Sequence, residues 1–143
     1  MSLSPTLVHL LQETTGAARA LQSGLDLVQA IRDGLPASSV DNFVRIGKLT
    51  NVEVDKIVLP RKTLAHRKEI GTLTADQSGR LLRVARAIAL AEDTLGSTEK
   101  ARFWLRRPTA ALDGETPLGL LDTEEGAREV ETLLTRIAHG IAA

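Results

Sequence analysis

The longest run of helical periodicity in the chain covers residues 75–95, and it constrains the fold more than any other feature. A capping box, Thr74-x-x-Gln77, opens this segment, and Gly96 follows it as a residue suited to ending a helix. The apolar positions recur every three or four residues, which places them on one face of an α-helix. These positions are Leu81, Val84, Ile88, Ala91 and Leu95. The sequence therefore predicts a long amphipathic helix here.

The other periodic segments also predict helices, separated by glycine or proline. The apolar residues are mostly Leu, Ala, Ile and Val, with only three aromatic residues, and this composition agrees with helices. Ser38 and Ser39 are candidate N-caps for one helix, and Asn51 is a candidate for the next. The predicted segments are 6–12 (a helix or an ordered arm), 22–33, 39–46, 51–58, 61–70, 98–106 and a last helix from Asp122 or Thr123 to Gly140. The expected fold class is all-α.

The bulk composition sets broad limits. A chain of 143 residues suits one or two small domains, and its 43% apolar content is enough for a packed core. The lack of cysteine excludes disulfides and thiolate zinc sites and fits a reducing compartment. The sequence contains neither an apolar run of about 18 residues nor the basic start and apolar stretch of a signal peptide, so we expect a soluble, cytoplasmic protein.

The formal net charge of zero hides an uneven distribution. Residues 61–107 carry eleven Lys/Arg and five Asp/Glu, whereas residues 108–143 carry two Lys/Arg and seven Asp/Glu. A basic middle followed by an acidic end suggests two different partners.

Side chains with catalytic or metal-binding chemistry do not form a recognisable set. His9, His66 and His139 fit neither the HxxxH nor the HExxH spacing of a metal site. The stretch GETPLG lacks the Lys-Ser/Thr that follows in a phosphate loop, and no GxSxG occurs. We therefore expect no enzyme activity, no metal site and no cofactor.

Residues 51–71 have the spacing of a helix-turn-helix, with a break at Leu59-Pro60-Arg61 between two short helices. In that motif the second helix enters the major groove of DNA. We expect Leu64 and Ile70 to anchor this helix to the core. Its candidate DNA contacts are Arg61, Lys62, Thr63, His66, Arg67 and Lys68. Spacing and charge alone also fit a solvated basic helix, which stays open as the alternative.

Two longer stretches, LPRKTLAHRKEIGTLTADQSGRLLRVARAIALAEDTLG and ARFWLRRPTAALDGETPLGLLDTEEGAREVETLLTRIAHG, carry a resemblance that covers residues from about 38 to 140. The second is the more specific. It contains Trp-Leu before a proline, Leu-x-Gly-x-x-Pro-Leu, Leu-Leu-x-Thr-x-x-Gly and Leu-x-Arg-Ile-x-x-Gly. The sequence resembles the Xre/MbcA/ParS-like antitoxins. It departs from them at Thr109-Ala110, where an asparagine often follows the proline, and the departure concerns only a local turn.

The resemblance implies the neutralising half of a type II toxin–antitoxin pair. Its usual toxin carries a RES domain and consumes NAD⁺, and the antitoxin covers the toxin's active-site cleft, dimerises and often represses its own operon. The implied organisation is an N-terminal helical or dimerisation region (1–37), an Xre-like helix-turn-helix domain (38–96) and a small helical toxin-binding domain (97–143). The expected partners are a RES-domain toxin, operator DNA and a second copy of the chain.

The toxin contacts are expected in the last of these regions. The candidates are Trp104, Asp113, Gly114, Pro117, Leu120, Leu121, Glu129, Leu133, Arg136, Gly140, Ile141, Ala142 and Ala143. We expect the acids of the last helix, including Glu124, Glu125 and Glu131, to steer a basic toxin surface. The terminal HGIAA is a hypothetical plug for the toxin's cleft.

Some alternatives stay open. A dimeric transcriptional regulator would use residues 97–143 only for oligomerisation, and a dimeric scaffold would have a degenerate helix-turn-helix. Trp104 fits the core better than a partner contact. Leu25, Val28 and Ile31 are either core, which is the simpler interpretation, or an N-terminal dimer contact.

Overall fold

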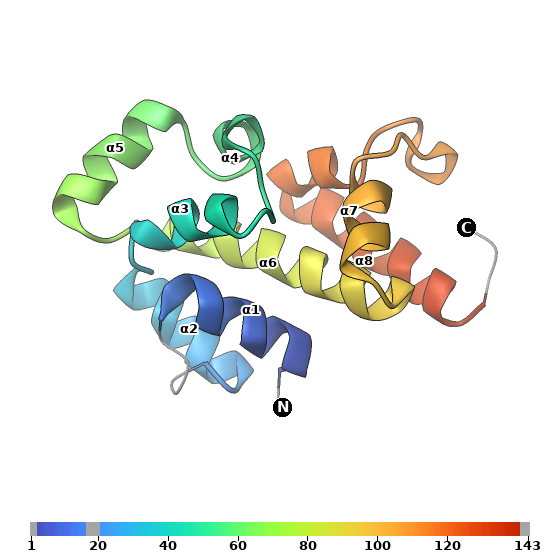
Figure 1. Cartoon of the computed structure of the whole chain (residues 1–143), viewed down its shortest axis with the longest axis horizontal. Coiled ribbons are helices and arrows are strands. Elements are labelled where there is room, and N and C mark those ends of the chain that lie inside the picture. Colours follow the sequence, from blue (N-terminus) through green and yellow to red (C-terminus); the bar gives the residue numbers. More distant parts are fainter. Residues whose placement is uncertain (1–2, 17–20, 141–143) are drawn as a thin grey trace. The chain divides into compact units, whose positions relative to one another are not determined.

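The computed structural model describes residues 3–16 and 21–140, which form α-helices joined by short turns (Figure 1). The chain divides into two compact units, Met1–Leu82 and Arg83–Ala143, here called the first and the second unit. The helices are α1 (Pro5–Thr15), α2 (Gly24–Asp33), α3 (Ser38–Arg45), α4 (Asn51–Ile57), α5 (Arg61–Ile70), α6 (Ala75–Leu95), α7 (Thr98–Leu105) and α8 (Glu124–Ala138), with the 3-10 helices η2 (Ala110–Leu112) and η3 (Leu118–Asp122). The predicted all-α fold is confirmed.

Capping side chains fix where several helices begin. The predicted box before α6 is present: the Thr74 amide donates to Gln77 Oε1 at 2.9 Å, and the Gln77 amide donates to Thr74 Oγ1 at 3.1 Å. Gly96 ends α6 with a φ of 73°, in the left-handed region that favours glycine. Both ends of the longest helix are therefore set by local chemistry.

The three predicted N-caps, Ser38, Ser39 and Asn51, are wrong, because all three lie inside their helices. Helix α4 is capped by Thr50, whose side chain forms a reciprocal box with Glu53, and Asn51 is already helical. Helix α3 follows Ala37, which cannot cap, while Ser39 is fully buried inside the helix. Packing sets the start of α3, because Ala37 and Val40 are both buried.

The core of the first unit is aliphatic around one aromatic ring. Phe43 is fully buried, and the other large buried side chains include Leu11, Leu21, Val40, Val58, Leu59, Leu73 and Leu81. Leu25 and Val28 of α2 are 82% and 39% exposed, so the core role expected for them is wrong. Helix α2 packs instead through Leu27, which points to a different side of the helix from Leu25 and Val28.

The chain before α3 and the chain after α5 are held together by backbone pairing. The Leu73 amide donates to the Leu35 carbonyl at 2.8 Å, and the Leu35 amide donates to the buried hydroxyl of Ser78 at 2.9 Å. Gly34 has a φ of 84°, and a Cβ there would overlap the Leu73 carbonyl oxygen. This junction fixes both ends of the α3–α5 segment.

The second unit has its own core, to which α7, η3, α8 and the end of α6 contribute. Its fully buried side chains include Leu121, Val130 and Leu134, and Ala101 and Leu105 are buried on α7. The apolar stripe predicted for α6 is buried at Leu81, Val84, Ile88 and Ala91, and half-buried at Leu95. No helix in the described ranges is long and apolar enough to cross a membrane.

Candidate functional site

The first candidate surface is the helix-turn-helix formed by α4 and α5. The break between them is anchored by Val58 and Leu59, which are buried, while Pro60 starts α5 with a φ of −63°. Pro60 has no side-chain donor or acceptor to cap the helix. The carboxylate of Asp55 takes that role, because its Oδ1 accepts from the Arg61 amide at 3.0 Å.

Leu64 is the one buried residue of α5, so nearly the whole helix faces away from the core. Ile70, predicted as a second anchor, is 53% exposed, and that prediction is wrong. The C-terminal end of α5 is held by polar contacts instead. Arg67 Nε donates to the Thr72 carbonyl at 2.8 Å, and Lys68 Nζ lies 2.8 Å from Asp41 Oδ2 on α3.

The six predicted DNA contacts therefore fall into two groups. Arg61, Lys62 and His66 are exposed on the N-terminal part of α5, with Thr63 half-buried beside them. Lys62 and His66 are four residues apart and share one face of the helix. Arg67 and Lys68 are engaged within the unit. The N-terminal half of α5 is thus the part whose side chains are best placed to reach a groove of DNA.

The second candidate surface lies in the second unit, where a tight turn connects η2 to η3. The predicted Asp113-Gly114 turn is present, and both residues have positive φ angles, of 54° and 83°. The Gly114 amide donates to the Thr109 carbonyl at 3.0 Å, and the Thr109 amide donates to the Glu115 carbonyl at 3.1 Å. This closed loop exposes the carboxylate of Asp113.

The motif Leu-Leu-x-Thr-x-x-Gly has a structural explanation in the junction of η3 and α8. Thr123 caps α8 by accepting from the Gly126 amide at 2.9 Å. Gly126 packs so closely against η3 that a Cβ there would overlap the Leu120 carbonyl oxygen. Arg83 of α6 completes the junction, because its Nε donates to the Leu121 carbonyl at 3.2 Å and its Nη1 lies 3.6 Å from Glu124 Oε2.

The residues predicted to contact a toxin are not equally accessible. Pro117, Leu121 and Leu133 are buried and belong to the core of the second unit. Trp104 and Leu120 are half-buried. The exposed ones are Asp113, Gly114, Glu129, Arg136 and Gly140. Ile141, Ala142 and Ala143 lie outside the described residues.

The acids of α8 are exposed along much of its length. Glu124 and Glu125 lie in the first turn, where the helix dipole favours negative charge. Glu125 pairs with Arg128 of the same helix at 3.1 Å, and both side chains are mostly exposed, so this pair adds little stability. Glu129 is exposed and Glu131 half-buried. The surface of α8 is therefore mainly acidic.

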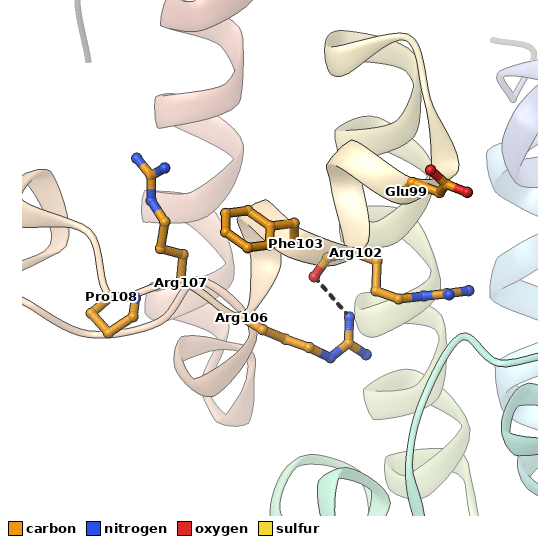
Figure 2. Close-up of a pocket in the computed structure, with 6 residues that line it drawn as sticks. All are labelled: Glu99, Arg102, Phe103, Arg106, Arg107 and Pro108. Atoms are coloured by element: carbon orange, nitrogen blue, oxygen red, sulfur yellow. Dashed lines mark hydrogen bonds between the residues drawn. The ribbon is translucent and has the colours of Figure 1, made fainter.

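The third candidate surface surrounds Phe103, which is not one of the predicted site residues. Phe103 on α7 is 68% exposed and borders a pocket of about 490 Å³, lined by Glu99, Arg102, Phe103, Arg106, Arg107 and Pro108 (Figure 2). The sequence signal was the pair Phe103-Trp104. Of the two residues of this pair, the phenylalanine is the more exposed one, because Ala101 and Leu105 define the buried face of α7.

Comparisons with known proteins match two family models to successive parts of the chain. The model for the antitoxin Xre-like helix-turn-helix domain matches residues 26–86. The model for the antitoxin Xre/MbcA/ParS C-terminal toxin-binding domain matches residues 90–140.

Three similar relatives extend over most of the chain. An Antitoxin Xre of Pseudomonas putida is 39% identical over 121 residues, which are 84% of this chain and 76% of that one. An Antitoxin Xre of Photorhabdus laumondii is 37% identical over 123 residues, covering 83% and 82%. A Prs ADP-ribosylating antitoxin of Sphingobium sp. is 31% identical over 134 residues, covering 82% and 81%. The chain therefore belongs to the Xre antitoxins, with a helix-turn-helix domain followed by a toxin-binding domain.

Proposed function

We propose that this antitoxin binds a RES-domain toxin that degrades NAD⁺ and occludes its active site. The observation that carries the proposal is the match of residues 90–140 to the toxin-binding domain, in a chain whose relatives are named antitoxins. Inhibition is steric: the antitoxin blocks access to the cleft, performs no catalysis and needs no cofactor. The complex forms in the cytoplasm, where NAD⁺ is available to the toxin.

The name of the Sphingobium relative supports a toxin that uses NAD⁺. That protein is named a Prs ADP-ribosylating antitoxin, and ADP-ribosylation takes its ADP-ribose from NAD⁺. An ADP-ribosylating toxin is therefore the second candidate partner. A RES toxin would release ADP-ribose, or a close derivative of it, into solution, whereas an ADP-ribosylating toxin would attach it to a target protein. Mass spectrometry of the reaction products distinguishes the two.

Occlusion is proposed to use the acidic surface of α8 and the residues that follow it. A cleft that binds the phosphates of NAD⁺ needs positive charge, and Glu124, Glu125 and Glu129 offer carboxylates for it. The predicted contacts Arg136 and Gly140 lie near the C-terminal end of α8. Deletion of residues 140–143 should weaken neutralisation, and unchanged inhibition by the truncated chain would remove this segment from the proposal.

We propose in addition that a homodimer represses its own operon through α5. One recognition helix contacts too few base pairs for high specificity, whereas a two-fold dimer reads two half-sites. The exposed Arg61, Lys62 and His66 support the assignment of the DNA-facing side.

The direct test is to look for a RES-domain protein encoded by a neighbouring gene and to co-express the chain with it. We expect relief of growth arrest, a stable complex on co-purification and preserved cellular NAD⁺. Arrest that persists although both proteins are present and folded would exclude the antitoxin role toward that partner. An operator shift without any toxin complex would favour a dimeric regulator instead.

A further inference from the structure

The exposed aromatic ring of α7 lies in a basic setting. The pocket-lining residues Glu99, Arg102, Phe103, Arg106, Arg107 and Pro108 form what we call the Phe103 surface. Figure 2 shows the Phe103 ring and the side chains of Arg106 and Arg107 extending in different directions from the end of α7. Arg106 Nη1 donates to the Arg102 carbonyl at 3.1 Å, which holds one guanidinium near the backbone of α7.

Packing of the second unit does not explain the position of Phe103. Helix α7 is attached through Ala101 and Leu105, both almost completely buried, and Phe103 projects away from them. Single exposed apolar side chains are common in folded proteins, but Phe103 differs from the others in bordering a pocket rimmed by charged residues, a setting that often marks a binding surface. Phenylalanine and arginine are also enriched in protein–protein interfaces, and buried aromatic or arginine anchors supply much of the binding energy.

The charges around the ring define the chemistry of the partner. Three arginines contribute to the Phe103 surface against one acid, Glu99, and Lys100 lies next to it in sequence. Guanidinium groups form their strongest hydrogen bonds with carboxylates, often two at a time. The complementary segment therefore carries an apolar side chain that packs against Phe103 and Pro108, with Asp or Glu on either side of it.

We propose that the Phe103 surface is a second docking site for the toxin, which receives an apolar, carboxylate-flanked segment of the toxin. The inference rests on the proposed toxin partner and adds to it a contact of opposite charge to the acidic surface of α8. The Phe103 surface lies within the stretch that matches the toxin-binding domain. A basic and an acidic contact on one unit fix the orientation of the partner, because a reversed arrangement would place like charges together.

A second copy of the chain fits the Phe103 surface less well. In a two-fold dimer the same patch meets itself, so three arginines from each copy would be brought together. Pairing this surface with the acidic α8 of another copy joins unlike patches and produces an open chain or a ring.

Nucleic acid also fits the surface less well. Residues 83–143 contain eight Lys/Arg and ten Asp/Glu, so the basic charge is confined to the small Phe103 surface, whereas a nucleic acid needs basic groups along many consecutive phosphates. The acidic toxin segment is therefore the occupant that the charges favour.

The test measures binding of the full-length chain to the toxin, using a catalytically inactive toxin variant. Phe103→Ala should raise the Kd at least about ten-fold, as expected when an aromatic anchor is truncated. Arg107→Glu should slow association, and the effect should shrink as salt is added. Val52→Ala is the matched control, because Val52 is 62% exposed in the first unit and its loss should leave the Kd unchanged.

Further readouts separate the alternatives. Arg86→Glu reverses an exposed charge of α6 in the same unit, outside both α8 and the Phe103 surface, and should not weaken binding, in contrast to Arg107→Glu. Toxin affinity within two-fold of wild type for both Phe103→Ala and Arg107→Glu would overturn the proposal. If these variants, without toxin, form smaller oligomers than the wild type, the surface binds a second copy of the chain. If they lose only affinity for operator DNA, the surface binds DNA. If the wild-type chain does not bind the toxin at all, the proposed function fails first and this inference with it.

Discussion

The structure explains why the Leu-Leu-x-Thr-x-x-Gly motif has a threonine and a glycine at these two positions. Gly126 lies in the first turn of α8, against the carbonyl of Leu120, and has no room for a side chain. The motif's glycine is therefore a packing requirement of the η3–α8 junction. Thr123, three positions earlier in the motif, has the complementary role of capping the helix.

Replacing Gly126 by alanine should destabilise the second unit by roughly 1–3 kcal/mol or more, since backbone must move to admit the Cβ. Gly79→Ala in α6 is the control, because a Cβ there meets nothing within 4 Å and alanine favours a helix. Urea unfolding of both variants measures the difference. Equal stabilities for the two variants would contradict the close approach of η3 and α8.

A second residue-scale prediction concerns Asp26 in the capping box of α2. The Gln22 backbone amide, followed in effect by the Ser23 hydroxyl and amide, donates hydrogen bonds that lower the pKa of this carboxyl from 3.8. A lowered pKa in the folded state means that the stabilisation is present above the unfolded pKa and is lost as pH falls through the folded value.

The difference in Tm between the wild type and Asp26→Asn should therefore be constant from pH 7 to about pH 5 and shrink below about pH 4. Thermal melts followed by circular dichroism measure it, and acids common to both proteins cancel. A difference that grows on acidification would have the wrong sign for this account.

At the scale of the element, α5 makes little apolar contact with the core, and polar contacts hold both of its ends. Leu64 is its only buried residue, and Asp55, Asp41 and the Thr72 carbonyl hold its two ends. These contacts leave Lys62 and His66 on an outward face of the helix. The helix is thus positioned mainly through its termini.

Lys62→Ala should weaken operator binding about equally for different sequences and lower the slope of log K against log salt by about one, as expected for a lost phosphate contact. Lys100→Ala, an exposed lysine of the second unit, should leave the slope unchanged. Titration by fluorescence anisotropy at several salt concentrations gives both slopes. An unchanged slope for Lys62→Ala would exclude this residue from the DNA contact.

The sequence predicted the positions of the helices better than it predicted which side chains are buried and which contacts join one helix to another. Periodicity located the stripe of α6, and the box of Thr74 and Gln77 was recognisable because both partners are local. The cap of α5 was not, because Asp55 reaches it from the preceding helix. The exposure of Ile70 and Leu25 depends on which neighbours pack nearby, and a one-dimensional pattern does not contain that information. The sequence likewise shows that Phe103 is large and apolar, but it does not show that this side chain is exposed.

At the scale of the whole molecule, the two units carry separate surfaces. The basic N-terminal half of α5 belongs to the first unit, and the acidic α8 with the Phe103 surface belongs to the second. Arg61→Ala should therefore weaken operator binding while the toxin Kd stays the same. Gel shifts and calorimetry on the same preparation test this, and loss of toxin neutralisation by Arg61→Ala would show that the surfaces are assigned incorrectly.

The proposed function of this chain is to silence an NAD⁺-consuming toxin by covering its active site. Its most direct test is the rate of NAD⁺ loss by the purified toxin, measured as the antitoxin is added. NAD⁺ loss should stop once the antitoxin saturates the toxin, and the antitoxin alone should consume none. Continued NAD⁺ consumption by a toxin saturated with bound antitoxin would contradict occlusion of the active site.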